Sequence, residues 1–316
     1  MPQIVIPDDE PAVLVPSKAY HKLDGYDVRA YDTRPSTGDE LVERISDAEI
    51  VINIRSSCRF DNAVLEACPS LRMISIWGTG TDNVDLPAAR KRGVRVANTP
   101  AVAKDAVAEH TLMLMLAAGR RITEVDRRVR NGEWPRAMIT QLHGKTLGLI
   151  GLGAIGTQVA RLGKGIGMNV VAWTFNPSDN LATEIGFEFV SLEDVFRLSD
   201  VVSVHVRQSE DTQGMISVRQ FEMMKRSAIF INTARGAIVD EDALIEALRS
   251  RTIAAAGLDV FQQEPLREGT GFSDLDNVVL TPHSAGISPE TTEAGLAMTI
   301  DNVFDFLAGN PGNVVV

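Results

Sequence analysis

The sequence predicts an α/β protein built from two doubly wound parallel-sheet domains. Short β-branched runs alternate with helix-like segments along the chain, and they fall into two successive blocks. The chain has 316 residues, of which 44% are hydrophobic and 23% are charged, as in ordinary folded proteins of two domains. We therefore expect two cores, each formed where helices cover a sheet.

The first block ends near Asn98 and includes helix-like segments such as Leu41–Ile45 and Leu86–Lys91. Its strand candidates are short apolar runs: Ile4–Ile6, Val28–Tyr31, Ile50–Ile54, Met73–Trp77 and Val94–Ala97. Because these runs are short and largely apolar along their length, they indicate strands of a sheet that is covered by helices.

The second block contains six strand candidates, the number in a complete dinucleotide-binding sheet. They are Thr146–Ile150, Val170–Thr174, Val201–Val206, Ala228–Asn232, Ala255–Leu258 and Val278–Leu280. Three helix starts carry residues that satisfy free N–H groups in the first turn: Ser191 with Asp194, Ser217 with Gln220, and Ser288 before Pro289.

The longest helical stretch, Ala106–Arg130, is predicted as one helix. Its centre, Leu112–Leu116, is apolar on nearly every side and must be buried on several faces. Two interpretations remain open at this point: a core helix between the domains, or a helix that also packs against a second subunit.

Composition excludes several functional classes. The net charge of −11 repels nucleic acid phosphates and anionic membrane surfaces. Cys58 and Cys68 have neither CxxC spacing nor a companion histidine pair, so neither a disulfide framework nor a metal site is indicated. Residues Met1–Pro11 do not resemble a signal peptide, and the longest apolar run, Leu112–Ala118, is too short to cross a bilayer. We expect a cytoplasmic protein with no nucleic acid or membrane partner.

A glycine-rich turn predicts a dinucleotide site. Residues 144–160 read GKTLGLIGLGAIGTQVA, in which an apolar strand turns through three glycines into a helix. Such glycines permit a tight turn and let the backbone approach a pyrophosphate, while the helix N-terminus supplies N–H groups and a positive dipole. The residues expected to bind the cofactor are Gly151, Gly153, Ala154, Ile155 and Gly156.

The identity of the dinucleotide stays open. Thr174 ends the next strand, where an acidic residue usually accepts from the adenosine ribose hydroxyls of NAD. The following residues, Phe175–Pro177, lack an arginine for the 2′-phosphate of NADP. Arg207 follows another strand and is a candidate contact near the adenosine end. NAD and NADP are both compatible with this pattern.

Three polar residues follow predicted strands on the edge where open α/β sheets bind ligands: Arg235, Glu264 and His283. Reduction of a 2-keto acid needs a cation for the carboxylate and carbonyl, an acid for the developing alkoxide, and a carboxylate that orients the acid. The three side chains supply these groups, so we predict that they converge on the reactive ring of the dinucleotide.

Along essentially its whole length, the chain resembles the D-2-isomer-specific 2-hydroxyacid dehydrogenase family, which includes phosphoglycerate dehydrogenases and glyoxylate or hydroxypyruvate reductases. The matching motifs occur in the family's order: IRSS at 54–57, GTGTDNVD at 78–85, VAEH at 107–110, the glycine loop, NTARG at 232–236, LDVF with EP at 258–265, and PHSAG at 282–286.

The resemblance implies that Arg235 binds the substrate carboxylate and keto oxygen, that His283 is the acid in reduction and the base in oxidation, and that Glu264 hydrogen-bonds the imidazole. It further implies substrate contacts from Arg55 and from the backbone amides of Thr79 and Gly80. Arg55 resembles a phosphate-binding arginine of phosphoglycerate dehydrogenases, but a role with any carboxylate, or in the loop alone, is also open. The remaining implied cofactor contacts are His205, Thr233 and Asp259.

The family architecture implies a Rossmann-type cofactor domain at 99–287 and a discontinuous, flavodoxin-like substrate domain at 1–98 and 288–316. It also implies a homodimer formed through the long helix after Asn98. Because the chain stops at Val316, we expect no C-terminal regulatory domain. Trp77 and Thr79 depart from the family's usual pattern in the loop near the substrate. We expect these two residues to affect the shape or polarity of the substrate pocket.

Two alternative functions use the same fold. Formate or phosphite oxidation is one, although formate enzymes typically pair the histidine with glutamine, where this chain has Glu264. The other is a nucleotide-sensing binding protein similar to transcriptional corepressors that retain the arginine, glutamate and histidine. The sequence leaves the physiological acid and the direction of flux open.

Overall fold

The computed structural model describes residues 2–55, 57–136 and 139–316. The chain divides into two compact units, one formed by Met1–Ala103 together with Ile287–Val316, the other by Lys104–Gly286. The sequence places these divisions after residues 98 and 287. The first unit is thus discontinuous, and the second is a single stretch of chain.

The described residues of the first unit form a five-stranded sheet in the order β2-β1-β3-β4-β5. All neighbouring strands are parallel. This is the flavodoxin-like order that the family implies. The strands are β1 (Gln3–Ile6), β2 (Asp27–Ala30), β3 (Ile50–Asn53), β4 (Met73–Ile76) and β5 (Arg95–Ala97).

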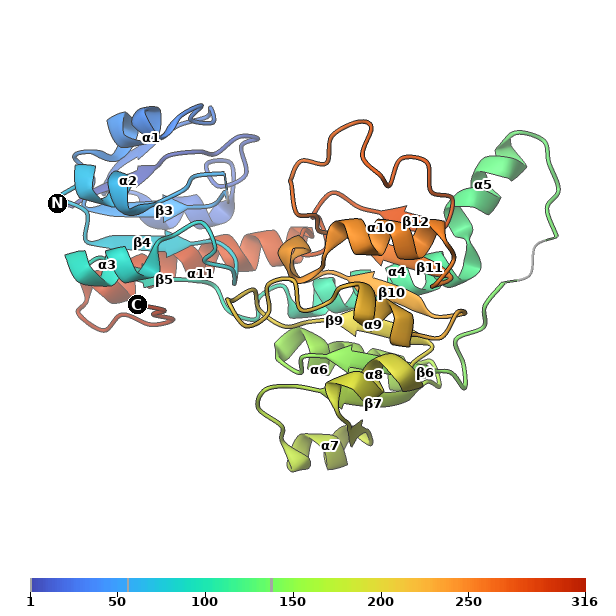
Figure 1. The fold of residues 1–316 in the computed structure, drawn as a ribbon. Coiled ribbons are helices and arrows are strands. Elements are labelled where there is room, and N and C mark those ends of the chain that lie inside the picture. The colour runs from blue at the N-terminus through green and yellow to red at the C-terminus, as the bar shows by residue number, and fades with distance from the viewer. Residues whose placement is uncertain (1, 56, 137–138) are drawn as a thin grey trace. The chain divides into compact units, whose positions relative to one another are not determined.

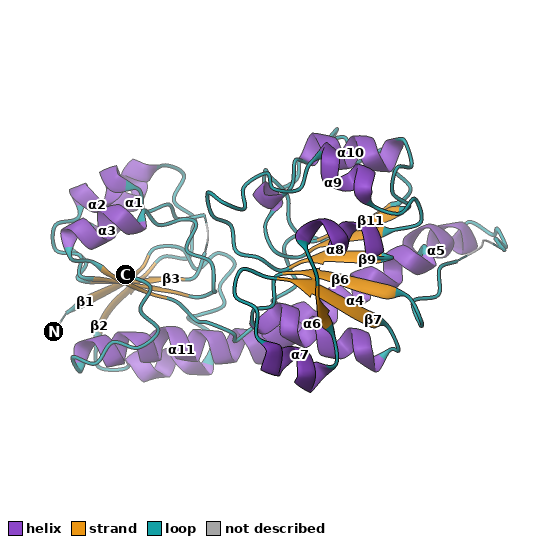
Figure 2. Ribbon diagram, turned by 60° about the horizontal axis from the view of Figure 1, so that its bottom comes forward, coloured by secondary structure: helices purple, strands orange, loops and turns teal. Residues whose placement is uncertain are grey.

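Helices cover both faces of this sheet (Figure 2). Val5 and Val51 point toward one apolar cluster, while Ile4 and Ile6 point toward the other, as the alternation of side chains along a strand requires. The short helices α2 (Asn62–Ala67) and η1 (Lys18–Leu23) have no clear periodic signal in the sequence. One face carries α1 (Gly38–Ile45), α2 (Asn62–Ala67) and α3 (Leu86–Arg92), and the other carries η1 (Lys18–Leu23) and α11 (Pro289–Leu307).

The described part of the second unit has seven parallel strands in the order β12-β11-β10-β9-β6-β7-β8. The expectation of six was wrong because β8 has only two residues, one of them charged, and therefore lacks the apolar run used to recognise strands. The strands are β6 (Thr146–Ile150), β7 (Asn169–Trp173), β8 (Glu188–Phe189), β9 (Val201–Val204), β10 (Ile229–Asn232), β11 (Ala255–Leu258) and β12 (Val278–Leu280).

Two helical layers enclose the second sheet (Figure 1). The predicted caps are present: the Ser191 and Ser288 side chains accept from first-turn N–H groups, and Ser217 with Gln220 forms a capping box. One layer holds α8 (Leu192–Leu198), α9 (Val218–Met223) and α10 (Glu241–Arg249), preceded by η2 (Gly236–Ile238); the other holds α4 (Lys104–Arg120), α6 (Ala154–Gly165) and α7 (Asp179–Ile185).

The predicted helix 106–130 is two helices, α4 and α5 (Ile122–Arg130), which is a correction. Arg121 adopts the left-handed conformation with φ of 52°, and this breaks the helical path. The expected burial was also only partly right, since Met113 and Leu116 keep 40% and 39% of their surface exposed. None of the described helices is long and apolar enough to cross a bilayer.

Close packing between β6 and α8 yields a stability test. A Cβ at Gly148 would lie 2.0 Å from Ser199 Oγ and 2.8 Å from Val195 Cγ1, whereas a Cβ at Gly165 has no neighbour within 4 Å. We expect Gly148→Ala to lower the free energy of unfolding by about 1–3 kcal/mol through overpacking. The matched Gly165→Ala variant should raise it, by up to about 1 kcal/mol, because alanine favours helix. Urea denaturation measures both, and equal effects would contradict the packing argument.

Candidate active site

The glycine loop lies between β6 and α6 in the centre of the second sheet. Gly151 has φ of 99°, and a Cβ there would lie 2.7 Å from the backbone carbon of His205. A Cβ at Gly156 would lie 2.1 Å from the carbonyl oxygen of Gly151. These two positions therefore require glycine so that the turn can pack against β9 and against the first turn of α6.

The same loop fits a dinucleotide pyrophosphate. Gly153 is the N-cap of α6, and a Cβ placed on it meets no atom within 4 Å, so ligand atoms have room to approach the backbone there. The first turn, which begins with Ala154 and Ile155, carries no acidic residue. Its N–H groups have no acceptor within the helix and carry the positive end of the helix dipole. The donor set thus suits an anionic ligand.

Thr174 and His205 follow the two strands that flank β6. Gly151 N donates to Trp173 O at 2.7 Å, and His205 N donates to Ile150 O at 2.7 Å, so both strand ends border the glycine loop. His205 Nε2 lies 2.9 Å from Ser203 Oγ. Burial lowers the pKa of His205 to about 3, so its ring is neutral at physiological pH and presents no positive charge to a cofactor.

His283 and Glu264 form the contact predicted from the sequence. His283 Nδ1 lies 2.6 Å from Glu264 Oε2, while the other carboxylate oxygen accepts from Phe261 N at 3.0 Å. Burial acts to raise the pKa of the Glu264 carboxyl, but these two hydrogen bonds, together with the nearby positive charges, outweigh it and hold the pKa below its ordinary value. Because Nδ1 faces Glu264, Nε2 is the atom left to exchange a proton with a substrate.

Arg235 lies near this pair. Its positive charge contributes to the lowered pKa of Glu264. The following residue, Gly236, is packed so closely that a Cβ on it would lie 2.0 Å from the backbone carbon of Phe261. Asn232 Nδ2 donates to Arg235 O at 2.9 Å and fixes the turn after β10. The loops that follow β10 and β11 are therefore in direct contact.

Asp259 and Thr233, both expected to bind cofactor, make their own internal contacts. The Asp259 side chain is 1% exposed and accepts hydrogen bonds from Thr281 Oγ1 at 2.6 Å, Ser284 N at 2.9 Å and Ala285 N at 3.0 Å. Thr233 Oγ1 lies 3.0 Å from Thr111 Oγ1. Sequence reasoning missed these partners, since nothing in a one-dimensional pattern pairs α4 with the residue after β10, or Asp259 with the loop after β12.

In the first unit, Thr79 and Gly80 follow β4. The Gly78 carbonyl accepts from Thr99 N at 3.0 Å, and the Thr79 carbonyl accepts from Asn98 Nδ2 at 2.7 Å. In a trans peptide the N–H points opposite to the carbonyl of the preceding residue. The N–H groups of Thr79 and Gly80 therefore point away from Asn98 and Thr99, as donors to a ligand must.

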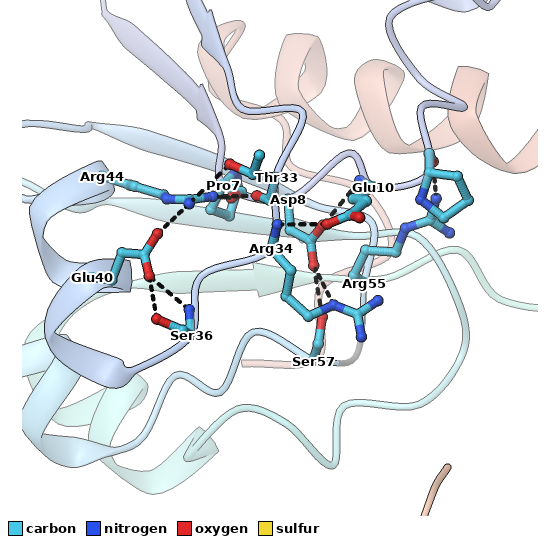
Figure 3. Close-up of polar contacts among 11 residues, drawn as sticks. Pro7, Asp8, Glu10, Thr33, Arg34, Ser36, Glu40, Arg44, Arg55 and Ser57 are labelled. Atoms are coloured by element: carbon cyan, nitrogen blue, oxygen red, sulfur yellow. Dashed lines mark hydrogen bonds and ion pairs between the residues drawn. The ribbon is translucent and has the colours of Figure 1, made fainter.

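Arg55 and Asp8 follow neighbouring parts of the first sheet, after β3 and β1, and Figure 3 shows the polar contacts around them. The Arg55 guanidinium donates to Pro11 O. Asp8 is 1% exposed and accepts from Ser57 Oγ at 2.8 Å and from Arg34 Nε at 3.4 Å. Asp8 and Arg34 were missed, although Asp8 follows β1 at the same sheet edge; Ser56 of the IRSS motif lies outside the described residues.

The indole of Trp77 packs against α11, as shown by the distance of only 2.2 Å between its Nε1 atom and a Cβ placed on Gly295.

Both cysteines are free and buried. Burial raises the pKa of Cys58 to about 12, so its thiol is unreactive at neutral pH. Over the described ranges, no group of three or more His, Cys, Asp or Glu side chains is arranged to hold a metal ion.

Comparison with known proteins identifies the family. The model of "D-isomer specific 2-hydroxyacid dehydrogenase, NAD binding domain" matches residues 112–285, more than half of the chain. The chain belongs to this family. The match spans the glycine loop, Arg235, Glu264 and His283, so the residues placed together above lie within the part that defines the family.

Relatives with assigned names cover nearly the same length. A glyoxylate reductase of Korarchaeum cryptofilum is 40% identical over 90% of this chain and 87% of its own. A glycerate dehydrogenase of Methylorubrum extorquens is 40% identical over 88% of this chain and 89% of its own. Among solved structures, an acyclic imino acid reductase in complex with NADPH and D-Arg has a TM-score of 0.90 at 29% identity, covering 99% of this chain and 100% of that one.

The contact between His283 and Glu264 can be tested by titration. Because the pKa of Glu264 is held below its ordinary value of 4.5, the contact is intact above that pH and is lost as the pH falls through the lowered pKa. In His283→Ala the burial effect remains without the imidazole, so the pKa of Glu264 should rise. Carboxyl ¹³C NMR measures it, and an unchanged titration would show that the contact does not form in solution.

Proposed function

We propose that this protein is an NAD(P)-dependent oxidoreductase that interconverts a small 2-keto acid and its D-2-hydroxy acid. The observation that carries the proposal is the contact between His283 and Glu264, with Arg235 close by, on the carboxyl edge of a sheet whose glycine loop fits a dinucleotide. Membership of the D-2-hydroxyacid dehydrogenase family supports the same reaction class. NAD and NADP both remain candidates for the cofactor.

The residues divide the chemistry between them. The bound nicotinamide would supply the hydride that reduces the keto carbon. Arg235 binds the substrate carboxylate and polarises the keto oxygen, and the N–H groups of Thr79 and Gly80 receive the carboxylate. His283 donates a proton from Nε2 to the developing alkoxide, while Glu264 holds the ring through Nδ1. In the oxidation direction, neutral His283 accepts the proton back.

Other assigned residues complete the cofactor site. Each of them directly follows a strand on the ligand-binding edge: Thr174 follows β7, His205 follows β9, Thr233 follows β10 and Asp259 follows β11. The glyoxylate reductase and glycerate dehydrogenase among the relatives direct the search for a substrate toward glyoxylate and hydroxypyruvate. Arg55 would then bind a substrate carboxylate, or a second anionic group if the substrate carries one.

Nicotinamide absorbance provides the decisive assay. Wild-type protein should turn over at least one of glyoxylate, hydroxypyruvate, pyruvate, phenylpyruvate and 3-phosphoglycerate with NAD(H) or NADP(H). His283→Ala should lower kcat by about 10²- to 10⁴-fold because a positioned acid is lost. Cofactor affinity, followed by fluorescence, should stay nearly unchanged.

A histidine outside the candidate site supplies the matched control. His21 is exposed in the first unit, and His21→Ala should keep wild-type activity. Wild-type protein that binds cofactor but turns over none of the acids would favour a nucleotide-sensing protein. Full activity in His283→Ala would remove the proposed acid. Turnover of formate alone would favour the other alternative, which Glu264 disfavours.

We also propose a homodimer, located in the cytoplasm. Large apolar side chains are exposed on α4, on α5 and in the segment after α5. This set, the apolar arm, has exposed fractions between 39% and 80% and consists of Met113, Leu116, Ile122, Val129, Trp134 and Ile139. Exposed apolar surface of this extent is typical of a protein interface, and a second copy of the chain is the partner that the family resemblance implies.

Charge placed on the apolar arm should separate the subunits. In the double variant Leu116→Glu and Ile122→Glu, two carboxylates would need to be buried at the interface, which is strongly unfavourable. Sedimentation velocity should show a dimer for the wild type and a monomer for the variant. Leu198→Glu, on α8, is the matched control for an exposed leucine elsewhere and should remain dimeric. A monomeric wild type would contradict the proposal.

A further inference from the structure

His110 is a partly buried histidine that the proposed chemistry does not use. It lies on α4 in the VAEH motif, and its side chain is only 17% exposed. Its Nε2 atom lies 2.9 Å from Thr281 Oγ1 and 3.5 Å from Asp259 Oδ1. Both neighbours belong to the second unit and contact the backbone of His283. His110 therefore contacts residues that hold the proposed acid, and not the acid itself.

The hydrogen bonds determine which atom donates. Thr281 has a single hydroxyl proton, which it donates to Asp259 Oδ1 at 2.6 Å. Its oxygen can therefore only accept from His110, which requires a proton on Nε2 of that ring. The result is a chain of donors from His110 through Thr281 to the buried carboxylate.

That carboxylate shapes the loop that presents His283. Asp259 accepts from Ser284 N and Ala285 N, and its backbone carbonyl accepts from His283 N at 2.8 Å. His283 itself has φ of 51°, a left-handed conformation that costs energy for a residue with a side chain. Such strain persists only where surrounding contacts impose it, and here they come from Asp259 and its donors.

We propose that His110 is a positioning residue for His283: by fixing Thr281 and Asp259 it holds loop 281–285 in the conformation that places the imidazole against Glu264. This inference rests on the proposed role of His283 as the acid. The proposed chemistry then depends also on His110, a residue of α4 that is distant in sequence from His283 and Glu264. Thr111, the next residue of α4, contacts Thr233 in the same way, so α4 supports the loops after both β10 and β12.

Five variants test the inference. His110→Phe removes the donor while filling the space, and it should lower kcat by about 10- to 100-fold, since small displacements of catalytic groups have effects of that size. His110→Gln should retain most activity because its amide nitrogen reaches the position of Nε2, whereas the shorter His110→Asn should not. Thr281→Val should resemble His110→Phe, and Thr281→Ser, which keeps the hydroxyl, should resemble the wild type.

Two further measurements separate positioning from general destabilisation. In His110→Phe the pKa of Glu264 should move upward, toward its value in His283→Ala, because the imidazole has shifted; a purely structural role would lower the melting temperature without this change. Cofactor affinity should stay within about threefold of the wild type, since the loss concerns the acid. If His110→Phe instead lowers cofactor affinity and leaves kcat unchanged, His110 belongs to the cofactor site.

The outcomes distinguish the two proposals. If His283→Ala is fully active, the proposed function fails. If His283→Ala is inactive but His110→Phe has wild-type kcat, only the positioning role fails. Equal impairment of the Phe and Gln variants at position 110, or of the Val and Ser variants at position 281, would also overturn it, because the donor would then be irrelevant.

Discussion

Parallel strand pairing is the constraint on which this structure depends. In the second sheet β10, β11 and β12 are neighbours that run in the same direction, so the segments that leave their carboxyl ends meet at one edge. Arg235, Glu264 and His283 each occur in one of these segments. Residues separated by about fifty positions in the chain become a local cluster because the backbone ladder fixes the strand order.

Close backbone contacts then convert neighbouring loops into a defined site. Gly236 lies against Phe261 at a separation that excludes any side chain, which couples the Arg235 segment to the Glu264 segment. Gly156 lies against Gly151 in the same way and closes the glycine turn onto α6. Glycine is needed at Gly156 and Gly236 because the backbones approach too closely for a side chain. The backbone angles at these two positions would themselves allow another residue.

Buried polar groups supply the remaining precision. A buried carboxylate is costly unless its oxygens are hydrogen-bonded, and Asp259 satisfies that requirement with donors from a single loop. Asp8 does the same at the edge of the first sheet with Ser57 and Arg34 (Figure 3). In both units, therefore, a buried aspartate directly after or near a strand end organises the loops where ligands are expected.

The sequence by itself determined the fold class, nearly all the strands, the glycine turn and the identity of the three polar residues. These are local features: apolar runs mark strands, glycine spacing marks the turn, and ordered motifs mark the family. The two-residue strand β8 and the helix break at Arg121 were not predicted, because β8 carries no apolar run and the break depends on a backbone angle. Only the tertiary structure paired His110 with Thr281 and Asp8 with Arg34. Such contacts depend on how elements far apart in the chain pack together, and no local sequence pattern encodes that packing.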